Sequence, residues 1–127
     1  MDKKNILLVE DDNFIRQMYA TKIDELGIDI CTASKQEEVK SILENNKKQI
    51  SVILLDLILP DVSGFDILKW IKKQDSFKDI PVIVLSNLSS QADINHAFEL
   101  GVVEYIVKSN YTPTEVMRTV QKYLTNS

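Results

Sequence analysis

The chain has 127 residues, of which 44% are hydrophobic, and its 15 basic and 19 acidic side chains give a net charge of −4. This composition is that of one folded domain, predicted to span residues 1–127. It provides neither the positive surface that nucleic acid requires nor the roughly 20 consecutive apolar residues of a membrane span. A cytoplasmic location is expected, because the start Met-Asp-Lys-Lys has no signal-peptide core and the single Cys31 cannot form an internal disulfide.

The first predicted strand is Asn5–Val9, an apolar run that ends at three consecutive acids. From Asn13 onward, apolar residues recur at helical spacing, with Phe14 and Met18 on the apolar face, and a glycine suits the end of a helix. A helix is therefore predicted from Asn13, as its N-cap, to Gly27.

The next three elements are predicted to be a strand, a helix and a strand. Residues 28–33 alternate apolar and polar side chains, which is typical of a strand near the edge of a sheet. Ser34 followed by Glu37 predicts a capping box at the start of the helix. Val52–Leu55 is a continuous apolar run, typical of a strand buried on both faces, and it ends at Asp56.

The residues after Asp56 are predicted to leave the sheet as a loop. Pro60 cannot donate to a sheet ladder, and Gly64 tolerates backbone angles that other residues resist. Ser63, with Asp66 three residues later, then predicts the start of a third helix.

The following segment repeats this alternation of strand and helix. Residues 81–85 form a fourth strand pattern that is followed by Ser86, and a helix is predicted from about Ser90 to Gly101. A fifth strand pattern then leads directly to Lys108.

The final helix has a clear start, because Thr112 and Glu115 form a capping box around a proline in the first turn. Five strands thus alternate with five helices. This alternation predicts a doubly wound α/β fold, with a parallel sheet, right-handed crossovers and helices on both faces.

Polar side chains follow the ends of four of these strands. They are Asp11, Asp12, Asp56, Ser86 and Lys108. In open parallel sheets the carboxyl ends of the strands meet at one edge, where ligands bind. We therefore expect these side chains to share one crevice.

These side chains indicate a metal-assisted reaction at phosphorus. The carboxylates of Asp11, Asp12 and Asp56 would repel each other without a cation, and a donor set made only of oxygens favours Mg²⁺. A carboxylate beside a cation and a lysine is suited to accept a phosphoryl group, and Asp56 is the candidate acceptor. Lys108 would offset the charge of that group, while Ser86 would donate a hydrogen bond to it.

Four motifs of the chain, at their spacing, resemble those of the receiver domain of bacterial two-component response regulators, the chemotaxis regulators among them. These motifs are Leu-Val-Glu-Asp-Asp, Leu-Leu-Asp-Leu-Ile-Leu-Pro-Asp-Val-Ser-Gly, Val-Leu-Ser and Tyr-Ile-Val-Lys. The resemblance covers essentially the whole chain. It implies a flavodoxin-like sheet in the order 2-1-3-4-5 and a signalling domain rather than an enzyme. A sensor histidine kinase or a histidine phosphotransfer protein would donate phosphoryl from its phosphohistidine to Asp56, and the domain would assist its own phosphorylation and dephosphorylation.

The resemblance also implies how the pocket would bind its ligands. Asp12 and Asp56 would ligate Mg²⁺ directly, together with the backbone carbonyl of Ile58, and Asp11 would do so through water. Lys108 would bind a phosphoryl oxygen.

A switch is implied as well. Ser86 would move toward the phosphoryl group while Tyr105 turns inward, which changes the face formed by the fourth helix, fifth strand and fifth helix. That face would contact a downstream protein or a separate effector domain, and the domain would be a monomer, or a dimer when phosphorylated. The family usually has a proline in a cis bond after the lysine, but Ser109 stands there. A cis bond before serine costs about 2.5–4 kcal/mol, so a trans bond or a reshaped loop is expected.

Other functions stay open at this point. A Mg²⁺-dependent phosphatase with an aspartyl nucleophile would need a second acid at position 58, which is isoleucine. A nucleotide- or flavin-binding module would need a glycine-rich loop, and the chain has only 3 glycines. A degenerate receiver that acts only as a binding module is disfavoured by the retained acids, serine and lysine.

Overall fold

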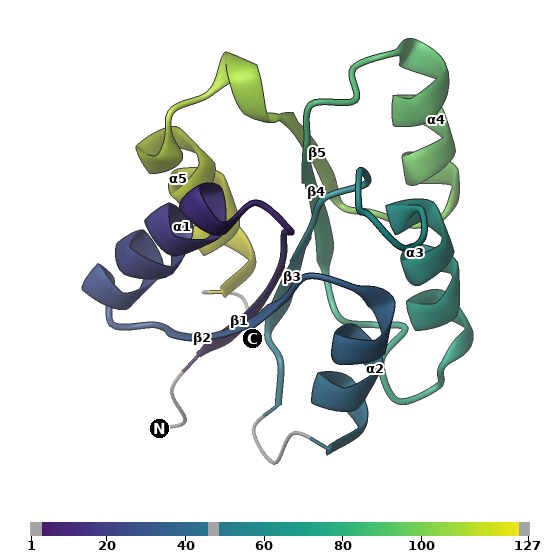
Figure 1. Ribbon diagram of the computed structural model, residues 1–127, viewed down its shortest axis with the longest axis horizontal. Coiled ribbons are helices and arrows are strands. Elements are labelled where there is room, and N and C mark those ends of the chain that lie inside the picture. The colour runs from purple at the N-terminus through teal and green to yellow at the C-terminus, as the bar shows by residue number, and fades with distance from the viewer. Residues whose placement is uncertain (1–3, 46–48, 125–127) are drawn as a thin grey trace.

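The computed structural model describes residues 4–45 and 49–124, so both ends of the expected 1–127 domain and residues 46–48 lie outside the described residues (Figure 1). Five parallel strands form one sheet in the order β2-β1-β3-β4-β5, which confirms the expected topology. The strands are β1 (Asn5–Val9), β2 (Asp29–Ala33), β3 (Val52–Leu55), β4 (Val82–Ser86) and β5 (Glu104–Val107).

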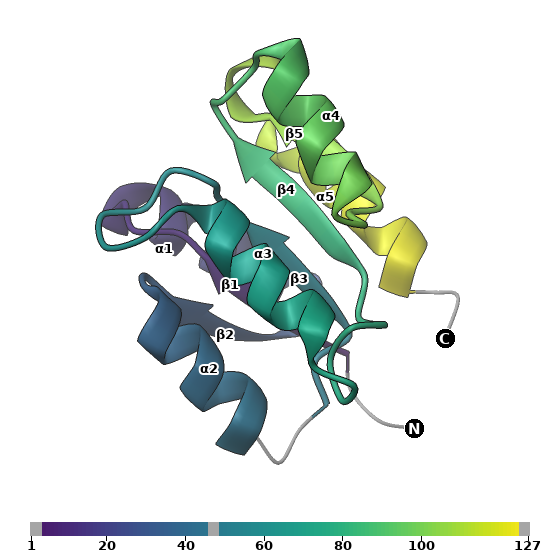
Figure 2. The same cartoon turned by 90° about the vertical axis from the view of Figure 1, so that its right-hand side faces the viewer.

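Helices cover both faces of this sheet. They are α1 (Asn13–Glu25), α2 (Gln36–Asn45), α3 (Gly64–Lys73), α4 (Gln91–Glu99) and α5 (Pro113–Leu124), with a short 3-10 helix, η1 (Lys108–Asn110), after β5. Helices α1 and α5 lie on one face, and α2, α3 and α4 lie on the other (Figures 1 and 2). Among the described residues, no helix combines the length and the apolar character needed to cross a bilayer.

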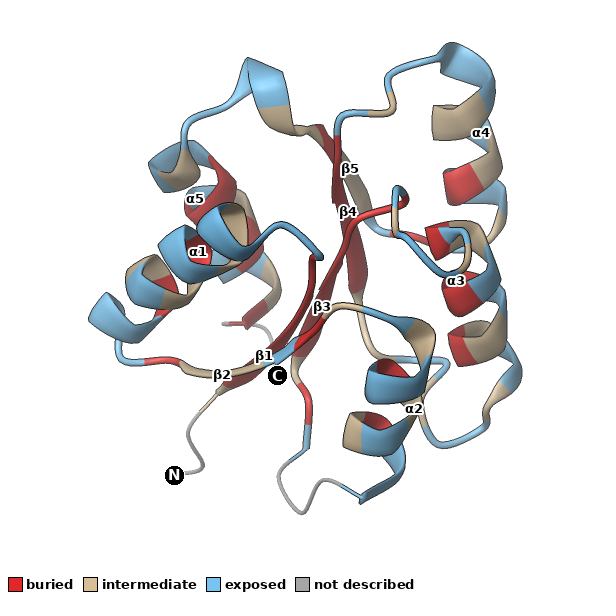
Figure 3. Cartoon of the chain, viewed as in Figure 1, coloured by how far each residue is buried: buried red, intermediate tan, exposed pale blue. Residues whose placement is uncertain are grey.

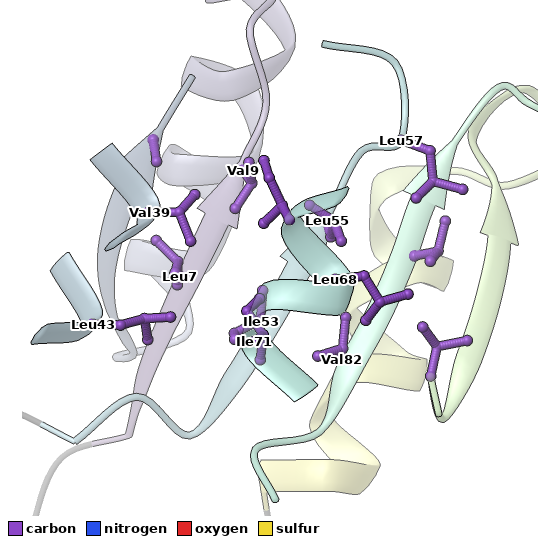
Figure 4. Close-up of a cluster of buried hydrophobic side chains, with 14 of the residues drawn as sticks. Leu7, Val9, Val39, Leu43, Ile53, Leu55, Leu57, Leu68, Ile71 and Val82 are labelled. Atoms are coloured by element: carbon purple, nitrogen blue, oxygen red, sulfur yellow. The ribbon is translucent and has the colours of Figure 1, made fainter. Parts of the chain in front are cut away.

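The central strands are buried on both faces, as their continuous apolar sequence predicts (Figure 3). Successive side chains of β3 point to opposite faces. Ile53 and Leu55 pack with Leu68 of α3 in one cluster, which Figure 4 shows, and Val52 and Leu54 pack in the second cluster under α1 and α5. The outer strands β2 and β5 are only partly buried.

Two helix caps differ from those predicted. The carboxylate of Asp12 caps α1, where it accepts a hydrogen bond at 3.0 Å from the backbone N–H three residues later, so Asn13 is the first helical residue and not the cap. At α2, Ser34 donates to Glu38 rather than pairing with Glu37, from its N–H at 2.7 Å and from its hydroxyl at 2.8 Å. In both cases two adjacent residues have a suitable side chain, and the local backbone selects one. Asp12 is used rather than Asn13 at α1, and Glu38 rather than Glu37 at α2.

The buried face of α1 is also narrower than predicted. It follows Ile15, Tyr19 and Ile23, which lie four residues apart. Phe14 and Met18 precede this row by one position and are rotated from it by about 100°. They are 79% and 36% exposed, so their predicted place on the core face is wrong.

Candidate functional site

The carboxyl ends of β1, β3, β4 and β5 lie at the same edge of the sheet (Figure 1). Polar residues stand at or directly after each of these ends. Asp56 and Lys108 are 52 positions apart in the sequence, yet Nζ of Lys108 lies 2.7 Å from Oδ2 of Asp56. The structure therefore brings together residues at the ends of β3 and β5, although β4 lies between these two strands in the sheet.

Lys108 lies between two carboxylates. Its ammonium group donates to Asp56 and also to Oε1 of Glu10, and the side chains of these acids are only 6% and 2% exposed. Burial lowers the pKa of Lys108, but its hydrogen bonds to Asp56 and Glu10 outweigh burial and raise the pKa above its ordinary value. The ammonium group is therefore charged at neutral pH.

The second oxygen of Asp56 is held by the backbone. Oδ1 accepts a hydrogen bond from the N–H of Ile58 at 3.0 Å, and the N–H of Asp56 donates to the carbonyl of Val9 at 3.0 Å. The carboxylate is thus fixed by the loop on one side and by Lys108 on the other.

Gly64 allows this loop to fold closely against α3. Its N–H donates to the carbonyl of Leu57 at 3.0 Å, and a Cβ atom at position 64 would lie 2.5 Å from the backbone oxygen of Asp56 and from Cα of Leu57. The φ angle of Gly64 is not positive. The expectation that Gly64 provides an unusual backbone angle is therefore wrong, since this glycine provides space.

Three carboxylates gather at this edge. Glu10, Asp11 and Asp56 each offer an oxygen atom, and these atoms lie within 4.8 Å of one another. Among the described residues, Asp12 is not part of this group, because its side chain caps α1. The group that the structure brings together thus differs from the expected set of Asp11, Asp12 and Asp56, because it contains Glu10 and lacks Asp12.

The position of Glu10 explains why it, and not Asp12, lies in this group. Its N–H donates to the carbonyl of Ala33 at 2.9 Å and so continues the pairing of β1 with β2, while Asp12 already belongs to the start of α1. Burial raises the pKa of Glu10, and the hydrogen bond from Lys108 offsets this only in part. The useful signal in the sequence was that Glu10 directly follows the last apolar residue of the strand.

Ser86 and Tyr105 are joined through Leu88. Ser86 is completely buried, and its Oγ accepts a hydrogen bond from the N–H of Leu88 at 3.3 Å. The hydroxyl of Tyr105 donates to the carbonyl of Leu88 at 2.7 Å, and burial raises its pKa. The two expected switch residues thus contact the same residue of the β4–α4 loop.

The bond after Lys108 is trans, as expected. No cis peptide bond occurs in the described part of the chain, and residues 108–110 form the 3-10 helix η1.

This fold and pocket define a class, namely doubly wound α/β domains with a lysine and a group of acids at the carboxyl edge of the sheet. The sequence profile of the response regulator receiver domain matches residues 6–121, and the chain belongs to this family of two-component signalling domains.

Individual relatives agree with this assignment. The probable transcriptional regulator ycf27 of Porphyridium aerugineum is 31% identical over 124 residues, which is 98% of this chain and 49% of that protein. The phosphorylated cyanobacterial phytochrome response regulator RcpA is 30% identical, with a TM-score of 0.82 over 95% of this chain and 91% of that one. The Mn²⁺-bound response regulator Rcp1 is 28% identical, with a TM-score of 0.80 over 94% and 90%. The chain thus spans about half the length of the curated relative and nearly all of the solved receivers.

Proposed function

We propose that this receiver domain accepts a phosphoryl group on Asp56 from the phosphohistidine of a sensor histidine kinase or a histidine phosphotransfer protein. The observation that carries the proposal is the 2.7 Å contact between Lys108 and Asp56 within a group of three acids, of which Glu10 and Asp56 are buried. RcpA, which is similar over nearly its whole length, is described in its phosphorylated form. The domain signals by this modification and is not a classical enzyme.

In this reaction an oxygen of Asp56 attacks phosphorus. The new P–O bond forms as the P–N bond to histidine breaks, and the electron pair leaves with the imidazole nitrogen. Lys108 is held charged beside Asp56 and binds an oxygen of the incoming group. The Oγ of Ser86 already accepts from Leu88, which leaves the hydroxyl hydrogen to be donated to another phosphoryl oxygen.

The acids fit a divalent cation. Glu10, Asp11 and Asp56 carry two more negative charges than Lys108 balances, and oxygen donors of this kind suit Mg²⁺. We assign the cation to these three carboxylates and to the backbone carbonyl of Ile58, with Asp12 replaced by Glu10 in the expected set. When bound, Mg²⁺ offsets negative charge on the transferring oxygens. The similar Rcp1 is described with Mn²⁺, which supports a divalent cation.

The signal would leave through the β4–α4 loop. A phosphoryl group adds a charge of about −1.5 to −2, which attracts the hydroxyl of Ser86 away from the N–H of Leu88. Tyr105 is bonded to the carbonyl of the same residue, so it follows the loop and alters the face of α4, β5 and α5. That face would contact a downstream protein or an effector domain, in the cytoplasm.

The test is mass spectrometry after incubation with Mg²⁺ and acetyl phosphate. The wild type should gain the mass of one phosphoryl group, and Asp56→Asn should gain none, because the nucleophilic oxygen is lost. Asp61→Asn is a matched control, since Asp61 is an exposed acid in the same loop. An adduct that persists in Asp56→Asn would place the acceptor elsewhere, and sustained hydrolysis of a phosphate ester would instead favour the phosphatase.

A further inference from the structure

The ladder between β4 and β5 ends at the active edge. Ser86 and Val107 are its last paired residues. One position further on, a side chain continues the contact: Oδ1 of Asn87 accepts a hydrogen bond from the N–H of Ser109 at 3.1 Å. This bond joins the residue after Ser86 to the residue after Lys108.

The N–H of Ser109 is a donor that η1 itself does not use. The first N–H groups of a helical turn have no partner within the turn, and Val107, at the N-cap of η1, makes no side-chain capping bond. Asn87 supplies the missing acceptor from a neighbouring loop. The pairing requires an N–H at position 109, which serine has and proline lacks.

The position of Lys108 depends on this turn because Lys108 is its first residue. The turn is closed by a backbone bond from the N–H of Tyr111 to the carbonyl of Lys108 at 3.4 Å, which is longer than the bond from Ser109 to Asn87. The ammonium must nevertheless lie within hydrogen-bond distance of Asp56. A side chain that holds the turn therefore also determines where the ammonium lies.

We propose that Asn87 is a positioning residue for phosphoryl acceptance. Through Ser109 it holds the turn that presents Lys108 to Asp56, and it ties this turn to the loop that begins at Ser86. The inference rests on the proposed phosphorylation of Asp56. The next residue, Leu88, is bonded to Ser86 and Tyr105, so Asn87 belongs to the same loop as the contacts of the proposed switch.

The test compares three variants by their rate of phosphorylation with acetyl phosphate and Mg²⁺. Asn87→Ala removes the acceptor and should slow phosphorylation about two- to tenfold, the range expected for the loss of one hydrogen bond. Ser109→Ala is the matched control, because it keeps the backbone N–H and should react at the wild-type rate. In a Lys108→Met background, Asn87→Ala should cause no further loss, since the group that it positions is gone.

Amide hydrogen exchange reports the bond independently of the reaction. Protection at residue 109 should fall in Asn87→Ala and persist in Ser109→Ala, while Val107 keeps its protection in both. An Asn87→Ala variant that loses protection but reacts at the wild-type rate would overturn the positioning role, and so would an equal loss in the Lys108→Met background. A wild type that takes up no phosphate would overturn the proposed function itself, even with the amide at 109 protected.

Discussion

Asp11 and Asp12 carry the same side chain at adjacent positions but differ in what they contact. An oxygen of Asp11 lies in the group with Glu10 and Asp56, whereas an oxygen of Asp12 caps α1. Asp11→Asn should therefore weaken Mg²⁺ binding by at least about tenfold, the scale of losses at metal sites. Asp12→Asn should leave Mg²⁺ binding nearly unchanged, because asparagine is an equally good cap.

Isothermal titration with Mg²⁺ measures this difference directly. The rise in melting temperature on addition of Mg²⁺ gives a second measurement, since a ligand that binds only the folded chain stabilises it. The assignment of Glu10 in place of Asp12 would be wrong if Asp12→Asn lost Mg²⁺ affinity and Asp11→Asn kept it.

Tyr123 links α5 to β5 and provides a prediction about pH. Its hydroxyl donates to Oε2 of Glu104 at 2.5 Å, and this hydrogen bond raises the pKa of Tyr123 to about 12. In the unfolded chain a tyrosine titrates near about 10. Between these values the unfolded state releases the proton and the folded state keeps it, so the contribution to stability is complete below the lower value and is lost as pH rises toward the upper one.

Tyr123→Phe removes this titration. Urea unfolding across the interval should show that the free energy of unfolding falls less steeply with pH in the variant than in the wild type. Tyr19 and Tyr105, whose pKa values burial also raises, are present in both proteins and cancel in the comparison. If the free energies of unfolding of the two proteins fell equally steeply with pH, the bond to Glu104 would not raise the pKa of Tyr123 in solution.

At the scale of elements, the junction of β3 and α3 depends on a close approach of backbone to backbone. A Cβ atom at Gly64 would lie 2.5 Å from backbone atoms of Asp56 and Leu57, which cannot move as a flexible side chain can. Gly64→Ala should lower the free energy of unfolding by about 1–3 kcal/mol, as overpacking does, and should slow phosphorylation because the loop carries Asp56.

Gly27→Ala is the matched control at the end of α1. Gly27 has a φ of +75°, and a Cβ atom there would meet nothing within 4 Å. This substitution should cost about 1–2 kcal/mol of backbone strain and leave the phosphorylation rate unchanged. Urea unfolding and phosphorylation rates separate the two cases, and an unaffected rate in Gly64→Ala would contradict the role given to the loop.

The elements were largely predictable because burial on both faces leaves a simple pattern in the sequence. The continuous apolar run of β3 and the capping box of Thr112 and Glu115 both appear in the structure as expected. Where two neighbours could serve equally, the choice was not predictable, because local geometry decides it. Asp12 beside Asn13 is the case that matters for the site, since the residue that caps α1 is also one of the expected metal ligands.

Of the site, only the residues that directly follow a strand could be predicted from the sequence. The approach of Lys108 to Asp56 follows from the parallel sheet, in which both residues come directly after a strand. The contact between Asn87 and Ser109 joins the β4–α4 loop to η1. Both residues are exposed, they are 22 positions apart, and neither has a distinctive pattern around it. Such a pairing is visible only when both segments are placed in space.

At the scale of the molecule, two regions toward opposite edges of the sheet should respond differently to phosphorylation. The β4–α4 loop is bonded to Ser86 and Tyr105, while α2 packs on β2 at the far edge of the sheet (Figure 1). Phosphorylation should therefore change amide hydrogen exchange in α4, β5 and the β4–α4 loop. Exchange in α2 should stay the same and serves as the internal control.

Two substitutions test whether this change in exchange passes through the contacts of Ser86 and Tyr105 with Leu88. Ser86→Ala removes the hydroxyl that the phosphoryl group attracts, so the variant should still be phosphorylated while α4 and β5 respond less. Tyr105→Phe removes the hydrogen bond to the carbonyl of Leu88 but leaves the pocket intact, so the loop should respond and β5 should not. A change in β5 that survives Tyr105→Phe would show that the signal crosses from β4 to β5 through the sheet ladder instead.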